Sequence, residues 1–135
     1  MIVVRNLTRQ KIDIDQWQRV SQLFLEQQGR AGEVSLVLVG DQRIRCLNNL
    51  YRHKDKITDV LSFNSDEPGQ LGEIIIDYQQ IVRQAKRFGN STWRELIFIT
   101  THGILHLLGH DDVDEAGWQV MERISQTFVD QQKIC

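Results

Sequence analysis

One stretch of this chain predicts the element around which the rest must pack: Trp93–Gly109, WRELIFITTHGILHLLG. Its apolar residues cover so much of a helical surface that the helix must be largely buried. His102 and His106 are four residues apart, so both imidazoles lie on one face of that helix and can reach the same ion. Gly109 then ends the helix, because glycine tolerates the left-handed conformation of a helical C-terminus, and the chain can turn back to deliver a third ligand. Three protein ligands and one open position, which keeps a water, are typical of a catalytic zinc ion.

The third ligand is to be chosen among His110, Asp111 and Asp112. In the long zinc-peptidase pattern H-E-x-x-H-x-x-G-x-x-H, the last ligand stands three residues after the glycine, and Asp112 holds that position here. His110 is the better zinc donor by type, but one residue past the glycine it has little chain with which to reach back. We therefore favour Asp112, since a carboxylate beside two imidazoles is a known catalytic set. In a competing interpretation Asp112 forms a capping box with Glu115, although Asp114 could cap the last helix instead.

Gly103 follows the first histidine, where zinc peptidases carry the glutamate that takes a proton from the metal-bound water. A glycine cannot move a proton, so peptide hydrolysis by that route is disfavoured. The metal alone can still lower the pKa of a bound water. The pattern favours an electrophile that needs little help from a base.

Length and composition indicate one globular domain that spans residues 1–135, with 41% hydrophobic and 25% charged residues. No apolar run approaches the roughly 20 residues of a membrane span, and no basic-then-apolar leader follows Met1. We therefore expect a cytoplasmic protein with no membrane partner. Cys46 and Cys135 offer no disulfide framework and no C-x-x-C pair, which favours two reduced thiols.

The other elements predict an α+β domain, in which a four-stranded mixed sheet packs with about five helices and the metal-binding helix is buried. The expected strands are 2–4, 34–39, 58–63 and 73–76. The expected helices are 14–29, 41–51, 81–88, 93–107 and one around 118–128. Segment 34–39 is apolar on both faces, which favours a central place in the sheet.

Side-chain spacing adds predictions for two helices. Asp41 is a candidate cap for the helix that follows it, and Ile44 and Leu50 turn inward from that helix. Trp118 and Met121 of the last helix fall at helical spacing, which favours core positions over ligand or cofactor contacts.

The net charge of −2 argues against a protein that coats nucleic acid generally, because phosphate affinity comes largely from Lys and Arg. A local group of cationic or potentially cationic residues can still bind phosphate: Arg52, His53, Lys54 and Lys56. A solvated turn, whose charges are paired with Asp55 and Asp59, is the alternative. A guanidinium offers a bidentate fork to phosphate oxygens, so Arg52 is the strongest candidate if the fold brings it to the metal.

Three blocks in order give the chain a resemblance to a known family: residues 51–63 (YRHKDKITDVLSF), 71–76 (LGEIII) and 102–112 (HGILHLLGHDD). Together they resemble the YbeY family, bacterial endoribonucleases of ribosomal RNA maturation, over most of the chain. The family pattern ends H-G-x-L-H-L-x-G-Y-D-H, so this chain differs at His110, where Tyr is usual, and at Asp112, where the third His is usual. It also carries His53 for a usual Gly, Ile57 for a usual Pro and Glu73 for a usual Asp.

The resemblance implies a hydrolase: a zinc-dependent, single-strand-specific endoribonuclease of rRNA processing and ribosome maturation. One zinc ion per chain would be held by His102, His106 and Asp112, with Arg52 as the catalytic clamp on the phosphate. The substrate-binding candidates are His53, Lys54 and Lys56. The expected partners are single-stranded RNA or rRNA and the ribosome or its associated proteins, with no organic cofactor.

Two alternatives remain from the residues alone. One is a zinc metallopeptidase, against which Gly103 argues. The other is a non-catalytic ribosome-binding factor in which the metal only joins the last two helices; an open coordination position would argue against it. Ser62 and Asp59 are weaker candidates for supporting roles, and Glu73 is as readily structural.

Overall fold

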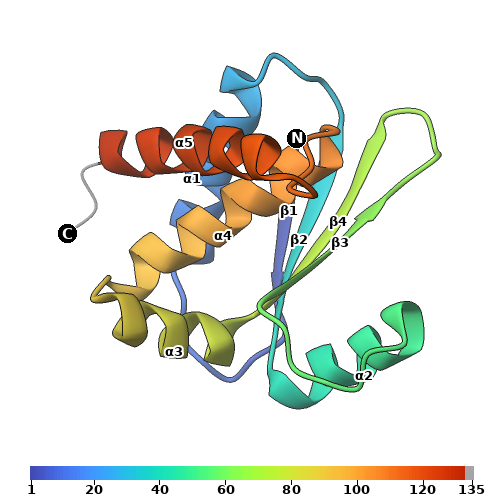
Figure 1. Ribbon diagram of the computed structural model, residues 1–135, viewed down its shortest axis with the longest axis vertical. Coiled ribbons are helices and arrows are strands. Elements are labelled where there is room, and N and C mark those ends of the chain that lie inside the picture. The colour runs from blue at the N-terminus through green and yellow to red at the C-terminus, as the bar shows by residue number, and fades with distance from the viewer. Residues whose placement is uncertain (133–135) are drawn as a thin grey trace.

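Four strands form one mixed sheet and five helices pack around it in the computed structural model, which describes residues 1–132 (Figure 1). The strands are β1 (Ile2–Asn6), β2 (Glu33–Val39), β3 (Val60–Asn64) and β4 (Gln70–Asp77). The helices are α1 (Ile14–Gln27), α2 (Asp41–Arg52), α3 (Tyr78–Phe88), α4 (Thr92–Leu107) and α5 (Glu115–Gln131). The predicted fold class is confirmed.

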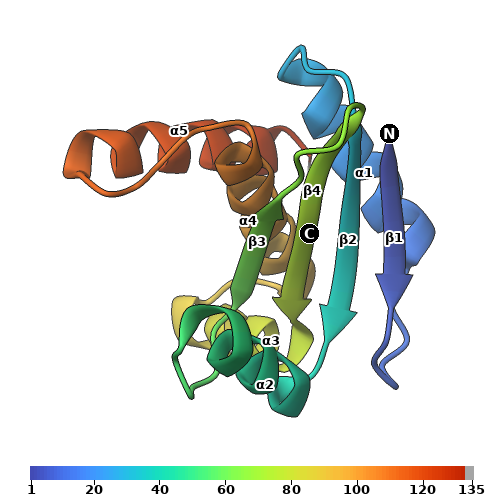
Figure 2. The same ribbon diagram turned by 90° about the vertical axis from the view of Figure 1, so that its right-hand side faces the viewer.

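The sheet has the strand order β1-β2-β4-β3, which Figure 2 shows face on. β1, β2 and β4 are parallel, whereas β3 runs antiparallel to β4 with Ser62 opposite Ile74. The central position predicted for β2 is confirmed, and β3 is an edge strand. β4 begins three residues earlier than predicted, because Gln70 and Gly72 already pair with β2 and β3.

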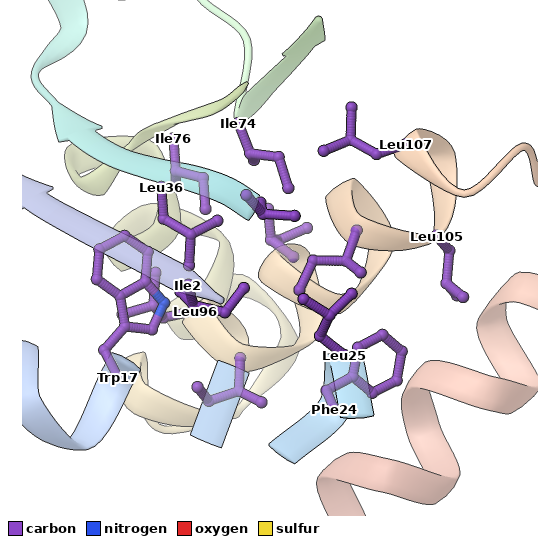
Figure 3. Close-up of a cluster of buried hydrophobic side chains, with 14 of the residues drawn as sticks. Ile2, Trp17, Phe24, Leu25, Leu36, Ile74, Ile76, Leu96, Leu105 and Leu107 are labelled. Atoms are coloured by element: carbon purple, nitrogen blue, oxygen red, sulfur yellow. The ribbon is translucent and has the colours of Figure 1, made fainter. Parts of the chain in front are cut away.

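One face of the sheet carries the main core, and α4 lies at its centre. Ten of the sixteen residues of α4 are buried, because this helix contacts the sheet, α1, α3 and α5. Figure 3 shows Leu36, Ile74 and Ile76 of the sheet in one cluster with Leu96 of α4. The predicted burial of this helix is therefore confirmed.

Within residues 1–132, α2 is the one helix on the opposite face of the sheet, and it lies at one end of that face (Figure 2). There Ile44 shares a second buried cluster with Val39 and Ile75. The prediction for Leu50 is wrong: this side chain is 62% exposed, because α2 turns Ile44 and Tyr51 toward the sheet and Leu50 lies away from that helical face.

The capping prediction for Asp41 is also wrong. Gly40 is the N-cap of α2 and makes no side-chain cap bond. The Asp41 carboxylate turns instead to the Arg83 guanidinium of α3, with Oδ1 and Nη2 2.7 Å apart.

Two further expectations concern membrane-spanning segments and the cysteines. Within residues 1–132, no helix combines the length and the apolar character needed to cross a membrane. Cys46 is an exposed, free thiol on α2; Cys135 lies outside the described residues.

Candidate metal centre and basic groove

The C-terminus of α4 makes the turn that the sequence predicts. Gly109 has a φ of +97° and its N–H donates to the carbonyl of His106 at 3.1 Å. The N–H of His110 donates to the carbonyl of Leu105 at 3.0 Å. These two bonds form a Schellman motif, which satisfies carbonyls at the end of the helix and turns the chain back.

The returning chain brings Asp112 to the histidine face. His106 Nε2 and Asp112 Oδ2 are 3.7 Å apart, and the charge of Asp112 also acts on His102. Asp112 does not cap α5, because the N-cap is Asp114, whose carboxylate accepts the N–H of Gly117 at 2.7 Å. The geometry thus places the Asp112 carboxylate beside the His106 imidazole.

His102 is the most enclosed member of this group. Its ring packs on Phe98 with centroids 4.5 Å apart, and burial lowers the pKa of His102 below its ordinary value. The neighbouring His106 adds to that lowering, whereas Asp112 and Asp59 oppose it. The imidazole is therefore held in its neutral form, which is the form that binds metal.

The Nε2 atom of His102 is buried and has no hydrogen-bond partner within the described residues. An unpaired buried nitrogen is costly, and a ligand that accepts its lone pair or its proton removes that cost. The two imidazoles and Asp112 fit zinc by donor type. In residues 1–132, however, no three His, Cys, Asp or Glu side chains already lie at metal-binding distances from one another.

Gly103 has a packing role that explains the missing glutamate. A Cβ at this position would lie 2.8 Å from Cγ2 of Ile74, because α4 approaches β4 closely here. A side chain here would force the Ile74 side chain or the helix to shift. The close packing therefore disfavours the catalytic base of the zinc peptidases at this position.

Arg52, Lys54 and Lys56 meet His106 along a groove of about 510 Å³, which runs by the free edge of β3. Asp55, which could have paired with these cations, binds Arg45 instead, with Nε and Oδ1 2.8 Å apart. Within residues 1–132 no ion pair involves the three groove cations, so their charges are available to an anion.

The edge of β3 orients Arg52. Its Nη2 donates to the carbonyl of Ser62 at 2.8 Å, and its guanidinium carbon lies 5.2 Å from the centre of the Phe63 ring. Asn48 fixes the loop beyond by donating to the carbonyl of Lys56 at 3.0 Å. Arg52 keeps further N–H donors for a ligand, because the guanidinium has five.

His53 does not line the groove. It is the C-cap of α2 in the left-handed conformation, with a φ of +58°, and its N–H donates to the carbonyl of Asn49. A left-handed cap is a position that favours glycine. Among the predicted substrate contacts, the structure thus gathers Lys54 and Lys56 with Arg52 and leaves His53 outside.

Sequence reasoning missed two features of the site. Asn64, at the end of β3, lines the groove and donates to the carbonyl of Leu107 at 3.1 Å, which ties the strand to α4. Trp118 was predicted in the core but is 47% exposed, and it lines a second cavity beside His102. Helical spacing correctly predicts that Met121 is buried. It could not show that the buried face of the last helix does not reach Trp118.

Comparison with known proteins identifies the family. A family model described as Endoribonuclease YbeY matches residues 3–133. The chain belongs to the YbeY family. A relative named Endoribonuclease YbeY from Carboxydothermus hydrogenoformans is 42% identical over 130 residues, which cover 90% of each protein. Another from Moorella thermoacetica is 45% identical over 119 residues, covering 77% of this chain and 76% of the relative.

A solved structure has the same fold. The solution structure of TM1509 from Thermotoga maritima aligns with a TM-score of 0.74 at 26% sequence identity, covering 97% of this chain and 88% of that one. The YbeY family membership expected from the three sequence blocks is therefore confirmed, and the neighbour supports the fold.

Proposed function

We propose that this protein is a zinc-dependent endoribonuclease, a hydrolase that cleaves single-stranded RNA in rRNA processing and ribosome maturation. The family and its relatives carry the name endoribonuclease, which supports RNA cleavage. The structural observation that carries the proposal is the groove in which Arg52, Lys54 and Lys56 meet His106. Cations beside a candidate metal ligand suit a phosphodiester better than a neutral peptide bond.

The proposed roles follow from position. His102, His106 and Asp112 would hold one zinc ion, which when bound acts as a Lewis acid on water or on a phosphate oxygen. Arg52 holds the phosphate and stabilises the charge that develops on it, while the Ser62 carbonyl keeps the guanidinium aimed along the groove. Lys54 and Lys56 hold neighbouring phosphates of the strand.

The setting in the cell is part of the proposal. The protein acts in the cytoplasm on rRNA, with the ribosome or ribosome-associated proteins as partners, and it needs no organic cofactor. The metallopeptidase alternative is disfavoured because Gly103 packs on Ile74. The binding-factor alternative is distinguished from a nuclease by whether the protein cleaves the RNA that it binds.

The test measures cleavage of labelled single-stranded and double-stranded RNA by the purified protein before chelation, after chelation and after zinc is restored. We expect cleavage of single strands that chelation abolishes and zinc recovers. Cleavage that survives complete metal removal would reject the zinc requirement. Binding of rRNA without any cleavage in the presence of zinc would move the binding-factor alternative ahead.

Arg52→Ala should lower kcat/KM for single-stranded RNA by about 10² to 10³, because it removes a donor that acts on the transition state. Arg52→Lys should recover only part, since an ammonium lacks the bidentate fork. Arg43→Ala is the matched control: Arg43 is exposed on the same helix, does not line the groove and makes no ion pair within residues 1–132. Equal rates for Arg52→Ala and Arg43→Ala would remove Arg52 from catalysis.

The salt dependence of RNA binding should report how many phosphates the groove contacts. Three cations would give a slope of about −2 in log K against log salt, at roughly −0.7 for each phosphate contacted on a single strand. Binding measured from 50 to 300 mM salt checks this value. A much steeper slope would show that a larger basic surface takes part.

A further inference from the structure

A pocket of about 520 Å³ lies on the α2 side of the sheet, beside the last turns of that helix. In the register of the sheet Ser35 of β2 pairs with Glu73 of β4, and Glu73 pairs with Phe63 of β3. These three side chains therefore form one row across the face. Tyr51 adds a wall from α2. We call the space between this row and Tyr51 the aromatic pocket.

Tyr51 is the open aromatic surface of this pocket. Its ring meets the Phe63 ring edge to face, with centroids 5.4 Å apart, yet the residue remains 59% exposed. Phe63 is half-buried, and the Arg52 guanidinium lies over its ring. Phe63 thus holds Tyr51 and Arg52 close to one another, and the Tyr51 ring is available to a flat partner.

The aromatic pocket adjoins the basic groove. Asn64, at the end of β3, lines both spaces. Phe63 contacts Tyr51 in the pocket and Arg52 in the groove. A single exposed aromatic residue is ordinary on a protein surface. This one, however, lies beside the cation proposed to hold a phosphate, and a nucleotide joins its base to its phosphate through one sugar.

Charge assigns the two spaces to different parts of a nucleotide. Among the described residues that line the aromatic pocket there is no Lys or Arg, and Glu73 contributes a carboxylate. The groove with its three cations is therefore the better site for a phosphate, and the pocket suits a neutral group. Ser35, Asn64 and Gln70 offer both donors and acceptors there, so the polar lining selects no particular base.

We propose that Tyr51 stacks on one unpaired base of the RNA strand whose phosphate Arg52 holds. Aromatic side chains stack on every base, because each base has a flat face, so the contact adds affinity without selecting a sequence. A base inside a duplex is covered on both faces by its neighbours and cannot stack on a side chain. This inference rests on the proposed function and assigns its preference for single strands to Tyr51.

The test uses the zinc-loaded protein and a short strand of abasic nucleotides with nuclease-resistant linkages. The strand carries either no base or one central 2-aminopurine, whose fluorescence falls when it stacks on an aromatic ring. In the parent protein we expect this fluorescence to fall on binding. The one-base strand should also bind about tenfold more tightly than the base-free strand.

Tyr51→Ala should abolish both the fall in fluorescence and the tenfold advantage, while the base-free strand binds as it does to the parent. Tyr51→Phe should retain the advantage, because stacking needs the ring and not the hydroxyl. Leu50→Ala is the matched control and should behave as the parent. Leu50 precedes Tyr51 on α2, is 62% exposed and lines neither the pocket nor the groove.

A second measurement tests the preference for single strands. Tyr51→Ala should lower kcat/KM for single-stranded RNA by about tenfold and leave cleavage of double-stranded RNA unchanged. A variant that keeps the full preference for single strands would reject the assignment of that preference to Tyr51.

The remaining outcomes separate the possible failures. Equal loss of affinity for both strands in Tyr51→Ala would mean that Tyr51 only positions Arg52 through Phe63, and would overturn the stacking. Unchanged affinity and fluorescence in Tyr51→Ala would also overturn it, and would leave this surface to another class of partner, such as a protein. Both results leave the nuclease intact if the parent cleaves single-stranded RNA. No binding or cleavage of single-stranded RNA by the parent would overturn the proposed function itself.

Discussion

Asp77 and His102 are both enclosed titratable residues with an atom that has no hydrogen-bond partner within residues 1–132. Asp77 is 0% exposed at the start of α3, where its Oδ1 accepts the N–H of Gln79 at 3.1 Å. Its other oxygen faces Asp41 and lies 3.9 Å from Arg83 Nη2. The partners of Asp77 are therefore parts of the fold.

His102 is placed differently. Its Nε2 is buried, yet the residue lines a cavity, and its charged neighbours Asp112 and Asp59 come from the turn after α4 and from the loop before β3. No fold partner completes its hydrogen bonding. The unpaired oxygen of Asp77 faces other groups of the fold, with which it can share a proton. The unpaired nitrogen of His102 belongs instead to a residue that lines a cavity, where a ligand can complete its hydrogen bonding.

The largest effect expected from this contrast is at His102. His102→Ala should abolish zinc binding, because it removes one of the two imidazoles, which suit zinc better than the remaining carboxylate does. Metal content by elemental analysis should fall from about one zinc per chain to below about one tenth, and His106→Ala should do the same. Full occupancy in either variant would end the metal assignment. Asp77→Asn should retain all its zinc, which separates the two regions.

Asp112 and His110 give the next largest effect. Asp112→Ala should weaken zinc binding about a hundredfold, whereas His110→Ala should change it by less than threefold, because the Asp112 carboxylate lies beside His106, with Oδ2 3.7 Å from Nε2. Competition with a chelator of known affinity measures both. The reverse ranking would show that the turn brings His110 to the ion. Asp112→His should preserve or tighten binding, since imidazole suits zinc.

The sequence predicted those parts of the molecule that depend on local pattern. The apolar run of α4, the four-residue spacing of its histidines and the turn at Gly109 are all properties of neighbouring residues, and the structure has each of them. The α+β class followed from the order of such segments. Leu50 shows the limit, because its exposure depends on which side of α2 packs on the sheet.

The parts that could not be predicted depend on contacts between distant segments. Arg52 reaches His106 only because β3 forms the edge of the sheet beside α4. The cavity at Trp118 requires α3, α4 and α5 to meet. Asp77 reads as an ordinary helix cap in the sequence, whereas its burial in the fold, together with the approach of Asp41 from α2, raises its pKa to about 7.

The smallest of these effects concerns stability at Asp77. Burial, together with the nearby Asp41 carboxylate, raises the pKa of Asp77 from 3.8 to about 7. The folded protein therefore binds a proton that the unfolded chain releases between these two values. The stability that this group contributes is complete below about pH 4 and is lost as the pH rises through 7.

Asp77→Asn should remove that loss. The amide keeps an acceptor for the Gln79 N–H and gains a donor toward Asp41, without a charge to bury. A pKa difference of three units sets a limit of about 4 kcal/mol, and because Asp41 shares the proton we expect about half of it. Urea unfolding at pH 4 and pH 8 should show a variant that is about 2 kcal/mol more stable than the parent at pH 8 and similar to it at pH 4. If the difference in unfolding free energy between parent and variant is the same at both pH values, Asp77 is ionised in the folded protein throughout. Its missing partner would then lie outside the chain, as for His102.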